Sequence, residues 1–135
     1  MTNCGCNRLS CTLAAAIAAV IAGIVAGFLQ ITAVITVTPA LLWAALAAAV
    51  VYLAVLTVVT GLAPTGECRL CMCRTLNTVL VGILGTILFA VVLLAVGIVA
   101  TSVVSAVLIG LLAAAATLTL AGTACLVRCM ADCQS

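Results

Sequence analysis

The sequence of 135 residues contains no histidine and no lysine, and it has only four arginines and two acids. Without histidine there is no Ser-His-Asp triad, no imidazole metal ligand and no CxxCH haem-attachment motif. The two acids, Glu67 and Asp132, are enough for a catalytic pair of carboxylates in principle, but no other residue supports such a mechanism. A net charge of +2 is too small for nucleic-acid binding, which needs a clustered basic face. We therefore expect no enzyme and no nucleic-acid partner.

Charge is absent from two long stretches, residues 9–66 and 75–127. Hydrophobic residues make up 69% of the chain and charged residues 4%, against about 45–50% and about 25% in soluble proteins. A helix of about 20 apolar residues crosses a bilayer, and each stretch is long enough for two such helices and a turn. The sequence predicts a single hydrophobic domain, 1–135, with four membrane-spanning helices.

Turn-forming residues divide the two stretches. Pro39 disfavours a helical conformation in the residue before it and suits the first turn of a new helix. Gly61 and Pro64 are expected to end the second helix, and the dipeptide 101–102 to form the second turn. The predicted helices cover about 12–38, 39–62, 75–100 and 102–130, with cysteine-rich segments at 4–11, 66–74 and 125–133. The predicted fold class is all-α, a bundle of four long antiparallel hydrophobic helices arranged as two helical hairpins.

An antiparallel order of the helices places the cysteines and the charged residues at one end of this bundle. Each hairpin returns the chain to the side from which it started, so the three cysteine-rich segments meet there. We therefore expect all nine cysteines and all charged residues at that end. The opposite end has only Gln30, threonines and serines.

Small residues recur at intervals of four in the predicted helices. Such faces let helix backbones approach closely where lipid supplies no hydrophobic drive for association. We expect them to pack helices together and to bring copies of the chain into contact. The expected helix-packing residues are Ala15, Ala19, Gly23, Gly27, Gly82, Ala106, Gly110 and Ala114.

The cysteines fall into three groups of three, which favours disulfide bonding. Bridges between groups would join helix ends, each contributing about 2–4 kcal/mol. Because nine is odd, at least one cysteine must stay free, bind a metal or bond to another chain. This favours cross-links between copies. The candidates are Cys4, Cys6, Cys11, Cys68, Cys71, Cys73, Cys125, Cys129 and Cys133.

Two further interpretations of the cysteines remain open. Cys68, Cys71 and Cys73 offer thiolates at spacings that zinc or an iron–sulfur cluster accepts. They are the expected ligands if a metal is bound, although the favoured prediction has no cofactor. Disulfide exchange is the other interpretation, since the Cys-x-x-Cys pair with four spans resembles the quinone-coupled disulfide oxidases. Those carry reactive pairs in the loops between helices 1–2 and 3–4, where this chain has no cysteine.

Arginines and cysteines at the same end indicate opposite redox environments. Arginines mark a cytoplasmic face, where thiols stay reduced, whereas nine cysteines indicate oxidation. Both hold for a protein assembled in a reducing cell and oxidised later, as in a bacterial spore-surface or envelope layer. We expect a non-enzymatic structural protein that partners with itself, in a lipid bilayer or surface assembly, as an array, shell or filament cross-linked by cysteines at one end. The alternative is a small integral membrane thiol protein that binds or carries a soft metal ion or exchanges disulfides.

Overall fold

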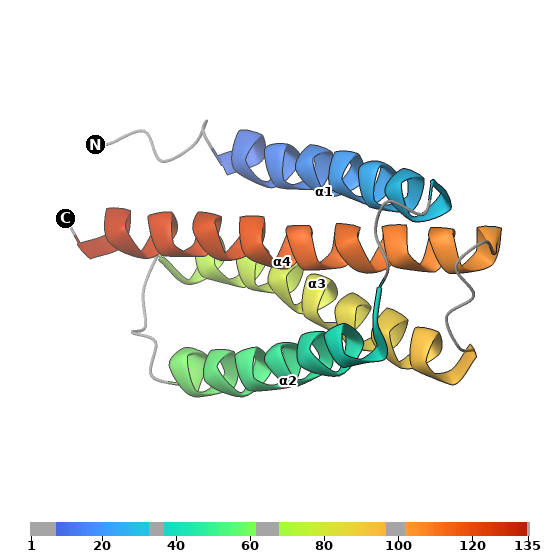
Figure 1. The fold of residues 1–135 in the computed structure, drawn as a ribbon. Helices are drawn as coiled ribbons and strands as arrows, with labels where there is room; N and C mark the ends of the chain where they lie inside the picture. Colours follow the sequence, from blue (N-terminus) through green and yellow to red (C-terminus); the bar gives the residue numbers. More distant parts are fainter. Residues whose placement is uncertain (1–7, 33–36, 62–67, 97–101, 135) are drawn as a thin grey trace.

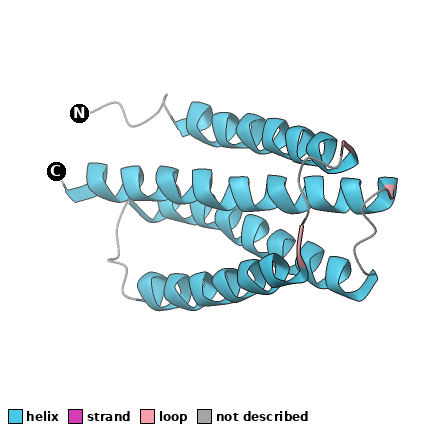
Figure 2. Cartoon of the chain, in the orientation of Figure 1, coloured by secondary structure: helices cyan, strands magenta, loops and turns pink. Residues whose placement is uncertain are grey.

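The computed structural model describes residues 8–32, 37–61, 68–96 and 102–134. They form four helices, α1 (Arg8–Ile31), α2 (Pro39–Gly61), α3 (Cys68–Val96) and α4 (Val103–Gln134), and this part of the chain contains no strand (Figure 2). The helices pack on one another with successive helices running in opposite directions (Figure 1). The fold class expected from the sequence is confirmed.

The fourth helix is the centre of the bundle. α1 packs along one side of α4 and α3 along another, while α2 packs mainly against α3 (Figure 1). The second predicted hairpin, α3 with α4, is therefore a packed pair. The first is not, because α1 takes α4 as its neighbour and α2 lies on the far side of the bundle (Figure 1).

Glycines explain why α1 prefers α4. A Cβ atom placed on Gly23 would lie 2.8 Å from the carbonyl oxygen of Gly110 and 3.0 Å from the Cβ of Ala114. One placed on Gly27 would lie 3.2 Å from the carbonyl oxygen of Ala106. The two backbones are thus in direct contact, a packing that only helices with small residues on both facing sides achieve.

A second close seam joins α3 to α4. A Cβ atom on Gly82 would lie 3.0 Å from the backbone nitrogen of Thr119, and one on Gly122 would lie 2.8 Å from Cγ2 of Val79. As residue numbers fall along α3, those of the facing residues rise along α4. Both seams are therefore antiparallel, and α4 uses small residues on two sides.

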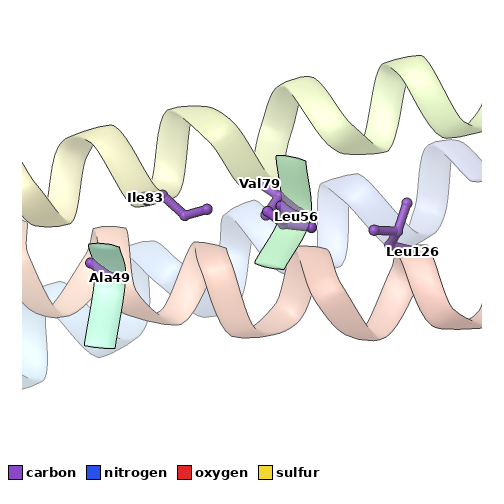
Figure 3. Close-up of a cluster of buried hydrophobic side chains, with 5 residues drawn as sticks. All are labelled: Ala49, Leu56, Val79, Ile83 and Leu126. Carbon is purple, nitrogen blue, oxygen red and sulfur yellow. The ribbon is translucent and has the colours of Figure 1, made fainter. Parts of the chain in front are cut away.

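Larger side chains fill the spaces beside these seams. One hydrophobic cluster joins α2, α3 and α4, and a second lies closer to the opposite end of the bundle. The first contains Ala49, Leu56, Val79, Ile83 and Leu126 (Figure 3), and the second Leu42, Leu93 and Ile109. These clusters attach α2 to the rest of the fold.

The first helix ends earlier than predicted, at Ile31 rather than near residue 38. The hydroxyl of Thr32 donates to the carbonyl oxygens of Phe28 and Leu29, each at 3.1 Å, and so occupies carbonyls at the end of the helix. Residues 37 and 38 are not helical, and residues 33–36 lie outside the described part of the chain. The second helix begins at Pro39, as predicted.

Three helices extend further into the cysteine-rich segments than predicted. α1 begins at Arg8, α3 at Cys68 rather than near residue 75, and α4 continues to Gln134. Segment 66–74 is thus helical from Cys68 onward. Arginine, leucine and methionine, which separate the cysteines here, favour helices, and packing on a neighbouring helix adds to that preference.

The contact between Gly122 and Val79 predicts that substitutions at these two positions have non-additive effects on the free energy of unfolding. Gly122→Ala is expected to lower the free energy of unfolding by about 1–3 kcal/mol, because the new methyl group would meet the Cγ2 of a valine that is fully buried. Val79→Ala alone leaves a cavity and is expected to cost about 1–3 kcal/mol. The double variant should lose less than the sum, which unfolding by SDS followed with pulse proteolysis would measure. Strict additivity would contradict the close contact.

The outer surface of the bundle is apolar. Four segments are long and apolar enough to cross a membrane, namely Cys11–Ile31, Pro39–Val58, Thr75–Val96 and Val103–Arg128, and at most 33% of any of them is buried within one chain. Ile24, Phe28, Trp43 and Leu120 are each more than 60% exposed. A soluble monomer rarely exposes continuous apolar surface on this scale. Length and composition therefore indicate a membrane protein.

Candidate functional site at the cysteine-bearing end

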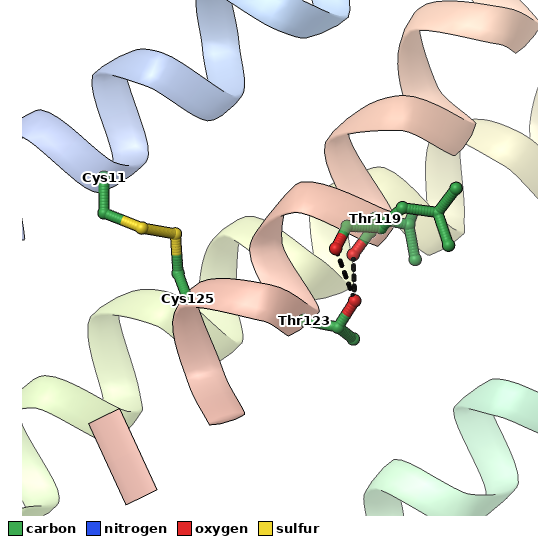
Figure 4. Close-up of a disulfide and its surroundings, with 5 residues drawn as sticks. Cys11, Thr119, Thr123 and Cys125 are labelled. Atoms are coloured by element: carbon green, nitrogen blue, oxygen red, sulfur yellow. Dashed lines mark hydrogen bonds between the residues drawn. A yellow bond between two sulfur atoms is a disulfide. The ribbon is translucent and has the colours of Figure 1, made fainter. Parts of the chain in front are cut away.

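A disulfide joins the first helix to the last. Cys11, in the first turn of α1, is bonded to Cys125 of α4 (Figure 4), with 6.3 Å between the two Cα atoms and 114 residues between them in sequence. Cys11 is half-buried and Cys125 is 8% exposed. The bond continues the antiparallel register of the α1–α4 seam toward the chain termini. Disulfide bonding was expected from the sequence, but this pairing was not specified.

The other described cysteines occupy helix ends on the same side. Cys68, Cys71 and Cys73 lie in the first turns of α3, and Cys129 and Cys133 lie in the last turns of α4. The starts of α1 and α3 and the end of α4 all lie at one end of the bundle (Figure 1). The remaining candidates, Cys4 and Cys6, fall outside the described residues.

The charged residues share this end. Arg69 and Arg74 lie in the first turns of α3, Arg8 begins α1, and Arg128 and Asp132 lie in the last turns of α4. Glu67 precedes the described part of α3. The opposite end carries uncharged polar residues, among them Gln30, Thr32 and Ser102. One end of the bundle thus holds the described thiols and charges, as the sequence predicted for the fold.

No metal site is formed by the side chains that the structure describes. Among these side chains, no three histidine, cysteine or acidic residues lie close enough to hold an ion. The side chains of Cys68, Cys71 and Cys73 are not among those described. Zinc or iron–sulfur binding by those three thiolates therefore remains a prediction.

Hydroxyl groups inside the spans donate to their own helices. Thr86 donates to the carbonyl oxygen of Gly82 at 2.8 Å, and Thr119 to that of Ala115 at 2.9 Å. Near the disulfide, Thr123 donates to the carbonyl oxygens of Thr119 at 3.0 Å and of the following leucine at 2.6 Å (Figure 4). In an apolar medium, such bonds satisfy hydroxyls without a ligand or water.

Gln30 is an unexpected feature of the opposite end. Its side chain is 2% exposed, and its Oε1 atom accepts no hydrogen bond from the part of the chain that the structure describes. A buried amide oxygen without a donor costs free energy. The sequence identified Gln30 only as a polar residue within a span, because burial and hydrogen bonding depend on the packed neighbours.

The expected helix-packing residues lie at contacts within the chain. Ala15, Ala19 and Ala106 are each less than 9% exposed, and the glycine contacts place Gly23 and Gly27 against Gly110, Ala106 and Ala114, and Gly82 against Thr119. These faces of α1 and α4 are therefore occupied inside one molecule. If copies of the chain associate, their contact has to use outward faces.

The site and fold together define a bundle of four membrane-type helices whose first and last helices are joined by a disulfide at a cysteine-bearing end. The chain matches no protein-family model, no curated protein and no solved structure.

Proposed function

We propose that this chain is a non-enzymatic structural protein of a membrane or a cell- or spore-surface layer, in which copies associate and are cross-linked by cysteines at one end. The observation that carries the proposal is the Cys11–Cys125 bond. It removes two of nine cysteines, and the seven that remain are again an odd number. Complete pairing then requires a partner outside the chain.

The position of the remaining thiols supports cross-linking between neighbours. Cys68, Cys71 and Cys73 at the start of α3 and Cys129 and Cys133 at the end of α4 lie at one end of the bundle. When molecules lie side by side in one layer with the same orientation, their cysteine-bearing ends lie at the same level of that layer. A bond between neighbours then needs only lateral contact.

The apolar exterior supports association in a membrane-like layer. Lipid covers such a surface, and so do other copies of the chain. On α2, Ala40, Ala44 and Ala48 recur at intervals of four and are exposed. A neighbouring copy could approach this face as closely as α1 approaches α4, because small residues permit backbone contact.

The threonines of the spans also support a structural role. A carrier needs polar groups that are free to meet its cargo along a path. Thr86, Thr117, Thr119 and Thr123 instead donate to carbonyl oxygens of their own helices. These hydroxyl groups therefore donate within their own helices and not to a cargo.

Gel migration with and without reductant tests the proposal. Membranes carrying the chain are washed with alkaline carbonate, their free thiols are blocked with N-ethylmaleimide, and the protein is run in SDS. We expect the chain to stay in the membrane pellet and to migrate above the monomer until reductant converts it to monomer. Metal analysis of the same material is expected to find no stoichiometric zinc or iron. A monomer without reductant that carries stoichiometric metal would contradict the proposal and favour a metal-binding membrane thiol protein.

A further inference from the structure

The α3–α4 seam consists of layers, each with one residue from each helix. In one layer, a Cβ atom placed on Gly122 would lie 3.8 Å from the Cβ of Val79. The same register sets Thr75 opposite Leu126 in the next layer toward the cysteine-bearing end, and both are buried, at 7% and 4% exposure. Contact between the two helices thus continues beyond the last glycine.

The next two layers follow from helix geometry. Alternating steps of three and four residues keep two antiparallel helices in contact along one seam. Down α3 these steps reach Met72 and then Cys68, and along α4 they reach Cys129 and then Cys133. Both backbones are helical over these positions. The register therefore sets Met72 opposite Cys129, and Cys68 opposite Cys133 in the last layer.

This last layer lies where α3 begins and α4 ends. α3 starts at Cys68 and α4 finishes one residue after Cys133, and in Figure 1 the start of α3 lies at the same end of the bundle as the last turns of α4. Disulfide partners have Cβ atoms about 3.8 Å apart on average, and a Cβ atom placed on Gly122 would lie 3.8 Å from the Cβ of Val79 in the same seam. We propose that Cys68 and Cys133 form a second disulfide within the chain.

The bond forms by thiol–disulfide exchange. One thiol loses its proton and attacks a disulfide oxidant, either a small molecule or another protein, which releases one thiol of the oxidant. The second cysteine then displaces the other half of the oxidant from the mixed disulfide. The two cysteines lose two electrons and two protons, and the oxidant becomes two thiols. Cys11–Cys125 already requires an oxidant of this class.

With the second bond, two disulfides hold the central helix α4. Cys125 ties α4 to α1, and Cys133 ties it to α3, at the same end of the bundle. Nine cysteines less these four leave five, still an odd number. The inference is separate from cross-linking between copies, because it concerns a bond within one chain.

Peptide mapping without reduction tests the bond. Cleavage after arginine places Cys68 in peptide 9–69, which the Cys11–Cys125 bond also joins to peptide 75–128, and it places Cys133 in peptide 129–135, which also contains Cys129. A Cys129→Ser background removes that ambiguity. After free thiols are blocked, we expect peptide 129–135 of this variant to appear only linked to peptide 9–69, and to be released by reduction.

Two further substitutions in this background identify the partner. Adding Cys68→Ser is expected to release peptide 129–135 without reductant, with Cys133 carrying the blocking label. Adding Cys73→Ser, the matched control on the same helix, is expected to leave the link intact. The inference is overturned if Cys133 is labelled in the Cys129→Ser protein, if the peptide stays linked after Cys68→Ser, or if these thiols hold stoichiometric zinc.

Isotope mixing separates this inference from the proposed function. Light and heavy copies are expressed together and mapped in the same way. We expect peptides 9–69 and 129–135 to be linked only within one isotope. A link between light and heavy peptides would overturn the bond within one chain, while supporting cross-linking between copies. A failed gel experiment would leave the isotope result unaffected.

Discussion

Cys11→Ser is expected to lower the free energy of unfolding by about 2–5 kcal/mol under oxidising conditions. The bond joins residues 114 apart in sequence, and in the chain-entropy description a loop of about 100 residues gives about 4.7 kcal/mol. Helices that persist in detergent have less freedom to lose than an unfolded soluble chain, which moves the expected value toward the lower end. Unfolding by SDS in mixed micelles, followed by pulse proteolysis, measures the difference.

Three controls make this result specific to the bond. Cys125→Ala is expected to lose a similar amount, and the double variant no more than either single one, since both changes remove the same bond. Adding reductant to the unchanged protein is expected to reproduce the Cys11→Ser value. If Cys11→Ser matched the unchanged protein without reductant, the pairing would be wrong. A loss for Cys125→Ala that persists in reductant would measure packing of this buried residue instead.

Helix number and the polarity of the bundle follow directly from the sequence. Two uncharged stretches, each too long for one span, define four helices, and alternation of direction gathers the described cysteines and charges at one end. These features depend on length and composition, which a sequence contains completely. The start of α3 was predicted too late. The charged residues around Cys68 indicated a loop, although the residue types between the cysteines favour a helix.

The choice of neighbours cannot be obtained in the same way. Small residues at intervals of four are visible on α1 and on α4, but the sequence does not say which face meets which. A short connection favours α1 with α2. The structure instead pairs α1 with α4, because Gly23 and Gly110 allow backbone contact, whereas α2 attaches to α3 through larger residues such as Leu56 and Ile83.

The disulfide pairing depends on that choice. Nine cysteines admit many pairings, and spacing alone does not rank them. Once α1 lies antiparallel to α4 with Gly23 against Gly110 and Ala114, the start of α1 lies beside the part of α4 that contains Cys125. Gln30 is a parallel case, since its burial results from the packing around it.

The α1–α4 contact is closest at Gly23 and Gly110, and Gly110 is a position where an added side chain is expected to be costly. A Cβ atom there would lie 2.8 Å from the carbonyl oxygen of Gly23 and 3.6 Å from the Cα of Gly27. Because the obstacle is backbone, no rotamer change relieves it. Gly110→Ala is expected to cost about 1–3 kcal/mol, and Gly110→Leu is expected to separate α1 from α4.

Separation of α1 from α4 can be detected as loss of the Cys11–Cys125 disulfide. Cys11 and Cys125 must come within about 7 Å at Cα to bond, so Gly110→Leu is expected to leave most molecules without this disulfide. Thiol labelling at Cys11 before reduction measures the loss, and pulse proteolysis measures the accompanying loss of stability. Ala124→Leu is the matched control, because it adds the same side chain to an exposed position of the same helix.

The control is expected to keep both the bond and the stability of the unchanged protein. If Gly110→Leu also kept both, α1 would not be held by backbone contact. If Gly110→Leu kept the bond but lost stability, the disulfide alone would be able to hold the helix ends together. The expected result, loss of both, would mean that close packing at Gly23 and Gly110 precedes the bond and selects Cys125 from the three cysteines of α4.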